Sequence, residues 1–74
     1  MDTNTASRQA GLNVRAEMAR KRVSQTDLGK HLGMSQAAVS AKLRGLTPFT
    51  IDQLASVAAL LEVPLETLTE GVAA

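Results

Sequence analysis

Apolar residues recur every three or four positions along most of the chain. This spacing matches the 3.6-residue period of an α-helix, in which such residues share one face. The pattern predicts helices over about 7–22, 25–32, 36–44, 51–61 and 65–69. We therefore expect an all-α fold of five helices.

The stretch 24–45 predicts two short helices joined by a tight turn. Ser24 and Ser35 stand where a hydroxyl can accept one of the N–H groups left unpaired at a helix start. Gly33 lies between them, where helices commonly end in the left-handed conformation that glycine adopts without strain. Two helices joined in this way form a helix-turn-helix, whose second helix often reads DNA in the major groove.

The helical wheel of the second helix separates its residues into two faces. Val39 and Leu43, four residues apart, share the face that we expect to pack on the first helix. The other face carries Gln36, Ala37, Ser40, Ala41 and Arg44. Gly29 inside the first helix is unfavourable relative to alanine, and we interpret it as a place where two helix backbones approach closely. An ordinary helical hairpin in a small bundle is the alternative interpretation.

The motif resembles that of the phage repressor and Cro-like helix-turn-helix proteins, also called XRE-type regulators. The matching residues are Ser24, Gln25, Gly29, Leu32, Gly33, Ser35, Gln36, Val39, Arg44 and Gly45. The runs 47–54 and 61–64 resemble the actinobacterial and actinophage branch of that family. The resemblance covers roughly residues 12–70 and implies a compact, lambda-repressor-like DNA-binding domain.

Gln36 is the best candidate for reading a base. Its amide can donate to N7 and accept from N6 of adenine, a pair worth about 1–3 kcal/mol, and the resemblance implies a base-reading glutamine at this position. Ala37 and Ala41 offer methyl surfaces to thymine, and Ser40 offers a hydroxyl of little discrimination.

The resemblance also implies residues that contact the sugar-phosphate backbone. Gln25 matches a glutamine that caps the first helix of the motif, contacts a phosphate and braces the base-reading residue. Positions flanking the groove are matched by Ser35, Arg44 and Thr47. Lys42 stands where many relatives have an apolar residue, and we expect its charge to lie in water or on phosphate.

The resemblance implies glycine at another position, after the long helix 51–61, where this chain has Glu62. If the left-handed turn is kept, a residue with a side chain costs about 1 kcal/mol there. Thr50 and Gln53 predict a capping box at the start of the same helix. Its wide apolar spread predicts a central helix buried on most sides.

The remaining segments complete the predicted organisation. We expect residues 1–6 to form a flexible arm, residues 7–70 to form the domain and residues 71–74 to form a free end. Phe49 is the only aromatic residue, and we expect it to plug the core and hold the loop before the long helix. In the last short helix, Leu65 and Leu68 either seal the core or make a dimer contact.

Charge is distributed unevenly, although the net charge is only +1. All eight basic residues and three of the seven acidic ones precede residue 46, so that part carries +5 and the rest −4. This polarity predicts a basic face suited to phosphates and an acidic face turned to solvent.

Composition limits the other possibilities. There is no cysteine, which fits a reducing cytosol, and no residue set suited to catalysis, to a cofactor or to a metal. His31 is the only histidine, and we interpret it as a surface residue. The longest apolar run, 57–61, is too short to cross a membrane. We expect a protein of the bacterial cytoplasm that is not an enzyme and binds no small molecule.

These observations predict a sequence-specific regulator that binds double-stranded DNA. The resemblance implies a repressor of phage or prophage type, and two half-sites about 34 Å apart would call for a homodimer on DNA. The alternative is a protein-interaction module of the same fold, such as an antitoxin or an adaptor of the transcription machinery.

Overall fold

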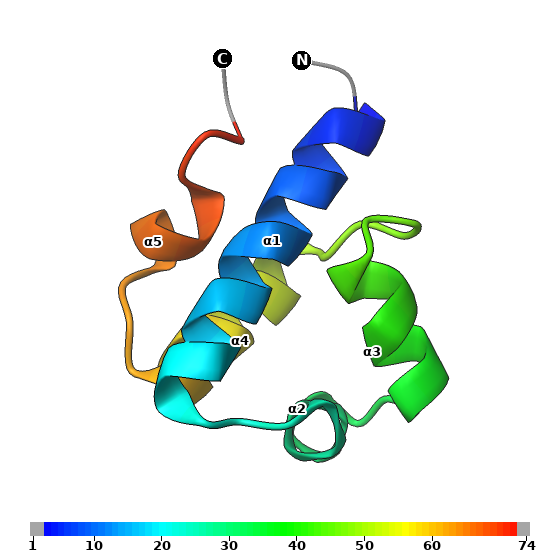
Figure 1. Ribbon diagram of the computed structural model, residues 1–74, viewed down its shortest axis with the longest axis vertical. Coiled ribbons are helices and arrows are strands. Elements are labelled where there is room, and N and C mark those ends of the chain that lie inside the picture. Colours follow the sequence, from blue (N-terminus) through cyan, green and yellow to red (C-terminus); the bar gives the residue numbers. More distant parts are fainter. Residues whose placement is uncertain (1–2, 73–74) are drawn as a thin grey trace.

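The computed structural model describes residues 3–72, which form five α-helices and no β-strand (Figure 1). The helices are α1 (Thr3–Lys21), α2 (Gln25–Leu32), α3 (Gln36–Leu43), α4 (Ile51–Leu61) and α5 (Leu65–Thr69). The prediction of an all-α, five-helix fold is confirmed. The predicted helix bounds agree with the observed ones to within one residue, except at the start of α1. No helix among the described residues is long and apolar enough to span a membrane.

The first helix begins four residues earlier than the pattern predicts. Residues 3–6 are helical where the sequence predicts a flexible arm, and residues 1 and 2 lie outside the described part. Ser7 and Ala10 are buried, so the N-terminal half of α1 packs against the protein and the helix extends beyond them. At the other end of the chain, a Cβ on Gly71 would lie 3.6 Å from the Gln9 side chain. Residues 73 and 74 of the predicted free end are not described.

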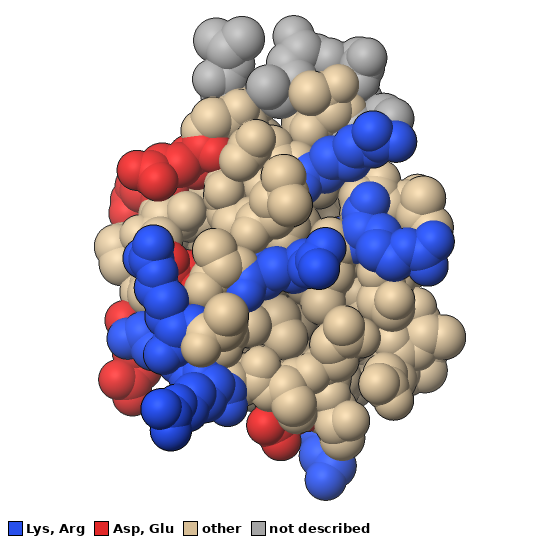
Figure 2. Space-filling view, viewed as in Figure 1, with Lys and Arg blue, Asp and Glu red and all other residues tan. Residues whose placement is uncertain are grey.

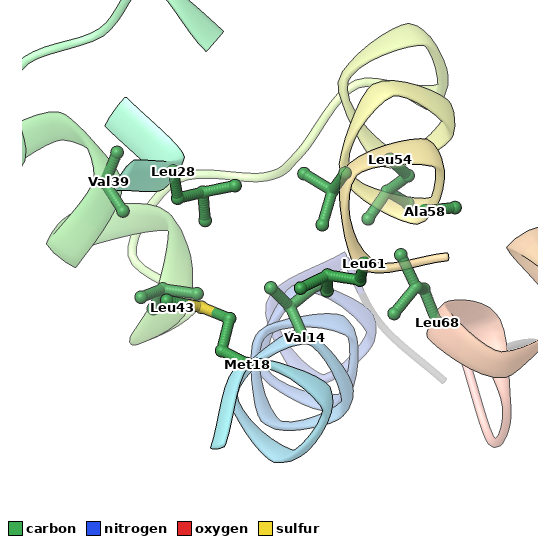
Figure 3. Close-up of a cluster of buried hydrophobic side chains, with 10 residues drawn as sticks. Val14, Met18, Leu28, Val39, Leu43, Leu54, Ala58, Leu61 and Leu68 are labelled. Carbon is green, nitrogen blue, oxygen red and sulfur yellow. The ribbon is translucent and has the colours of Figure 1, made fainter. Parts of the chain in front are cut away.

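All five helices contribute to one hydrophobic core, as Figure 3 shows. The buried apolar residues of this core are Val14, Met18, Leu28, Val39, Leu43, Leu54, Val57, Ala58, Leu61 and Leu68. Leu68 is fully buried and Leu65 packs partly against the same cluster. Of the two predicted roles for these leucines, the structure therefore supports sealing the core.

The prediction that α4 is buried on most sides is wrong. Only the face carrying Leu54, Val57, Ala58 and Leu61 is buried. Ile51 is 68 % exposed and Ala55 is exposed as well. The start of α4 extends past the core, and the capping box of Thr50 and Gln53 holds it there with hydrogen bonds of 2.9 and 3.0 Å.

Four helices end in the same way, with a left-handed residue followed by an apolar one. The left-handed residues are Arg22, Gly33, Gly45 and Glu62. The residues that follow them are Val23, Met34, Leu46 and Val63. The backbone N–H of each of these four apolar residues donates to the carbonyl of the residue five positions earlier, at 2.8–3.0 Å. This arrangement is the Schellman motif, which satisfies carbonyls that a helix end leaves unpaired.

The four ends differ in two ways. Two of the left-handed residues are glycines, whereas Arg22 and Glu62 carry side chains and both have φ 57°. The left-handed turn is thus kept at Glu62, and the one at Arg22 was not evident from the sequence. Val23, Met34 and Val63 pack against the core, whereas Leu46 is 60 % exposed. The end of α3 is thus the one of these four whose apolar residue stays in solvent.

Helix α1 holds α3 and α5 on two of its sides (Figure 1). A Cβ on Gly11 would collide with the carbonyl oxygen of Leu43 at the end of α3. On the α5 side, the Asn13 amide donates to the carbonyls of Leu68 and Glu70 at 3.0 and 2.8 Å. Glycine is unfavourable inside a helix, but at Gly11 it is the residue that lets α1 and α3 touch.

Candidate nucleic-acid interface

The two helices of the predicted motif are capped as the sequence indicates. The Ser24 hydroxyl accepts the Asp27 N–H at 3.0 Å, and the Asp27 carboxylate accepts the Ser24 N–H at 3.2 Å. At α3 the Ser35 hydroxyl accepts the Ala38 N–H at 3.1 Å. Gly33 between them is left-handed, with φ 67°. These contacts fix where α2 stops and where α3 begins.

The capping box at α2 also sets the charge state of Asp27. The hydrogen bond from the Ser24 backbone, followed by the one with its side chain, lowers the pKa of this carboxyl from its ordinary value of 3.8. A hydrogen bond that a carboxylate accepts favours its charged form. At neutral pH the first turn of α2 therefore carries a negative charge beside the positive end of its helix dipole.

Gly29 is a point of close approach, but the contact differs from the prediction. A Cβ there would lie 2.8 Å from the Met34 carbonyl oxygen, in the turn between the helices. The expected contact between two helix backbones is therefore wrong, because the backbone of the turn occupies that space. The Val39 side chain is the next neighbour, at 3.6 Å. Gly29 thus allows the turn to fold back on α2 and brings α3 against it.

The two faces of α3 are confirmed. Val39 and Leu43 are buried at 0 and 3 % exposure and pack against the other helices. On the opposite face Gln36, Ala37 and Arg44 are exposed, and Ser40 and Ala41 are half-buried. The outward face is thus made of small or polar side chains along its whole length.

Three of the candidate phosphate contacts lie at or just beyond the ends of α3, and the fourth, Gln25, lies at the start of α2. Gln25 is the first residue of α2 and is half-buried, while Ser35 is exposed. Because the Ser35 oxygen accepts the capping bond, its hydroxyl hydrogen remains to be donated. Arg44 and Thr47 are both exposed after the other end of the helix.

Lys42 is set apart from these residues. Its ammonium group donates to the Pro48 carbonyl at 2.7 Å and lies 5.8 Å from the centre of the Phe49 ring. The side chain is half-buried, and it joins the end of α3 to the following loop. Phe49 itself packs against the core, so the predicted plug is confirmed. The contacts of Lys42 with this loop were not evident from the sequence.

His31 makes a second contact that the sequence did not reveal. It is exposed, as predicted, but its Nε2 lies 3.1 Å from the Ser56 carbonyl oxygen and 3.0 Å from the Ser56 hydroxyl. These contacts connect α2 with α4. The histidine is therefore a link between helices. Within residues 3–72 no cluster of three histidine or acidic side chains could hold a metal ion.

Basic side chains gather on the face that α1 presents in Figure 1. Figure 2 shows lysine and arginine spread over this face, with several acidic side chains toward the α5 side. This distribution agrees with the polarity of the sequence, in which no basic residue follows Arg44. The end of α3 therefore lies at a positive region of the surface.

A family model described as a helix-turn-helix domain matches residues 9–70. The chain belongs to this helix-turn-helix family. The match covers all of α2 to α5 and most of α1, so the capped pair α2–α3 is the motif of that name. Helix-turn-helix domains characteristically bind DNA, with the second helix of the motif in the major groove. No curated protein matches the chain.

Proposed function

We propose that this helix-turn-helix domain is a sequence-specific transcriptional regulator that reads double-stranded DNA with α3. The proposal rests on one observation above all: the outward face of α3 carries small and polar side chains, while its inner face is fixed in the core by Val39 and Leu43. A rigid helix with such a face can enter a major groove, and it exposes no large apolar surface to water when DNA is absent.

In the groove, Gln36 is the residue that discriminates bases. It stands at the exposed start of α3, which is the end that approaches base edges in this kind of motif. Its amide pairs with adenine through N6 and N7. Ala37 and Ala41 contact thymine methyl groups, and Ser40 adds a hydroxyl that accepts or donates.

Phosphates are bound on both sides of this helix. Gln25, with Ser35 and its free hydroxyl hydrogen, binds one strand near the start of α3, and Arg44 and Thr47 bind near its end. The Lys42 ammonium keeps two N–H groups beyond the one on Pro48, and these reach phosphate from the loop.

In its biological role the protein is a repressor of phage or prophage type, related to the actinobacterial branch of Cro-like and XRE-type regulators. It acts in the bacterial cytoplasm at the nucleoid. A domain of 74 residues offers limited contact area, so two copies bind as a homodimer on half-sites about 34 Å apart. This assignment is supported by the resemblance of the residues in the motif.

Selection from a random double-stranded DNA library at about 150 mM salt tests the function, because nonspecific binding weakens steeply with salt. We expect one enriched motif, and its two-fold symmetry would reveal the dimer. Gln36→Ala should lose about 1–3 kcal/mol at a single base position. Arg44→Ala should weaken all sequences alike and reduce the salt slope by about one.

Glu66→Gln is the matched control, because this exposed residue of α5 lies across α1 from α3 (Figure 1). It should leave the enriched motif unchanged. If the folded wild type enriches no motif, the proposed DNA reading is wrong. The exposed side chains of Leu46 and Ile51 would then favour the protein-interaction module.

A further inference from the structure

Two arginines stand seven residues apart on α1, Arg8 and Arg15. Seven residues make almost two helical turns, so the two side chains lie on the same edge of the helix, about 10 Å apart along its axis. Arg22, after another seven residues, follows the last residue of α1 at the connection to α2. All three are exposed. We name Arg8 and Arg15 the arginine edge.

Contacts with the glycines show which way this edge faces. Gly11 lies three residues after Arg8 and four before Arg15, so it shares their side of the helix. That glycine touches the carbonyls of Lys42 and Leu43 at the end of α3. In addition, a Cβ on Gly45 would lie 2.7 Å from the Arg8 Cα. The arginine edge therefore flanks the contact between α1 and the end of α3.

The charges of this edge are not neutralised within the described residues. The one ion pair found in residues 3–72 joins Arg20 to Glu17 at 2.9 Å. Arg20 lies on another side of α1, nine residues from Gly11. The two arginines of the edge, together with Arg44, thus leave three positive charges around the end of the helix proposed to read DNA.

We propose that the arginine edge is a second phosphate-binding surface of this domain, formed by α1 outside the helix-turn-helix motif. Arg8 and Arg15 contact phosphates beside the groove that α3 enters, and the guanidinium of each forms charge-assisted hydrogen bonds with phosphate oxygens. The surface supplies affinity that does not depend on sequence. This inference rests on the proposed function, because it takes DNA as the ligand.

Double-stranded DNA fits this surface because one end of the arginine edge adjoins a candidate DNA contact. Arg8 lies against Gly45, next to Arg44. A polyanion bound at Arg44 is therefore also close to Arg8, and Arg15 continues the positive charge along α1. Without a bound anion, the clustered positive charges only repel one another.

The test compares the salt dependence of binding for the wild type and for the double variant Arg8→Gln/Arg15→Gln. Each lost phosphate contact lowers the slope of log K against log salt by about 0.9, so the double variant should lose about 1.8. The loss should be equal on the selected site and on unrelated DNA, and the enriched motif should be unchanged. Arg8→Lys/Arg15→Lys keeps both charges and should retain the slope.

Lys21→Gln/Lys30→Gln is the matched control, since it removes two exposed positive charges away from this edge. We expect the wild-type slope for the control. A double arginine variant that keeps the wild-type slope, or that loses no more than the lysine control, would overturn the arginine edge alone. Wild-type protein that enriches no site would instead refute the proposed function and the edge together. Melting curves establish that every variant is folded.

Discussion

The carboxylate of Asp27 stabilises α2 through the capping box with Ser24. Its pKa is lower in the folded protein than its ordinary value of 3.8, so the unfolded chain takes up a proton first as the pH falls. The stabilising contribution is therefore complete above that value. It is lost as the pH falls through the lower pKa of the folded state.

Asp27→Asn should lower the melting temperature at neutral pH, because the neutral amide interacts less well with the start of the helix. On acidification the difference from the wild type should shrink and disappear below the folded pKa. Melting temperatures measured from about pH 2 to about pH 7 check this. Asp52→Asn is the control, because Asp52 lies in the first turn of α4 but takes no part in the capping box of that helix. A difference that stays constant into acid would contradict the assignment.

Glu62 shows what a side chain costs in a left-handed turn. Its φ of 57° is unfavourable for a glutamate, and its negative charge stands at the negative end of the α4 dipole. Glu62→Gly should therefore raise the free energy of unfolding by about 1 kcal/mol. In a domain of this size that increases the melting temperature by about 4–8 °C.

Ala59→Gly is the control for this prediction, because it introduces glycine into the same helix at an exposed interior position. It should lower stability by about 1 kcal/mol. If both variants are destabilised, the left-handed turn at Glu62 is not strained.

The residues that cap and end helices could largely be predicted from the sequence, because their rules are local. Ser24, Ser35 and Gly33 follow such rules, and each is found in the expected role. Arg22 could not be recognised, since nothing local marks an arginine as left-handed. Its conformation follows from Val23 packing against a core that other helices build.

At the scale of elements, α1 positions α3 as directly as α2 does. The backbone of α1 touches the end of α3 at Gly11, where there is no room for a methyl group beside the Leu43 carbonyl. Helix pairing of this kind depends on residues far apart in the sequence. The pattern of apolar residues predicts each helix but not this contact, so Gly11 reads in the sequence only as a weak point of α1.

Gly11→Ala distinguishes the two views of this residue by the sign of its effect. Helix propensity alone predicts a gain of about 1 kcal/mol. The contact with α3 instead predicts a loss of about 1–3 kcal/mol, as for other overpacked sites. Urea unfolding of both proteins measures the difference. A more stable Gly11→Ala protein would rule out the close approach of the two helices.

For the whole molecule, the sequence predicted the outward face of α3 but not the surroundings of that face. The face follows from the helical period, which places Gln36 and Arg44 opposite Val39. The link of Lys42 to Pro48 and Phe49 and the arginine edge depend on how the loop and α1 pack around the end of α3. Such packing is fixed by the tertiary fold, which single-helix patterns do not encode.

The Schellman ends have a consequence for how the connections between helices open. The amide hydrogens of Val23, Met34, Leu46 and Val63 lie outside the helices yet are bonded to helix carbonyls. They should exchange with deuterium as slowly as many amides inside helices, because exchange requires the helix end to unravel. Leu46, whose side chain is not held by the core, should exchange first. The connection after α3 is then the place where this protein begins to loosen.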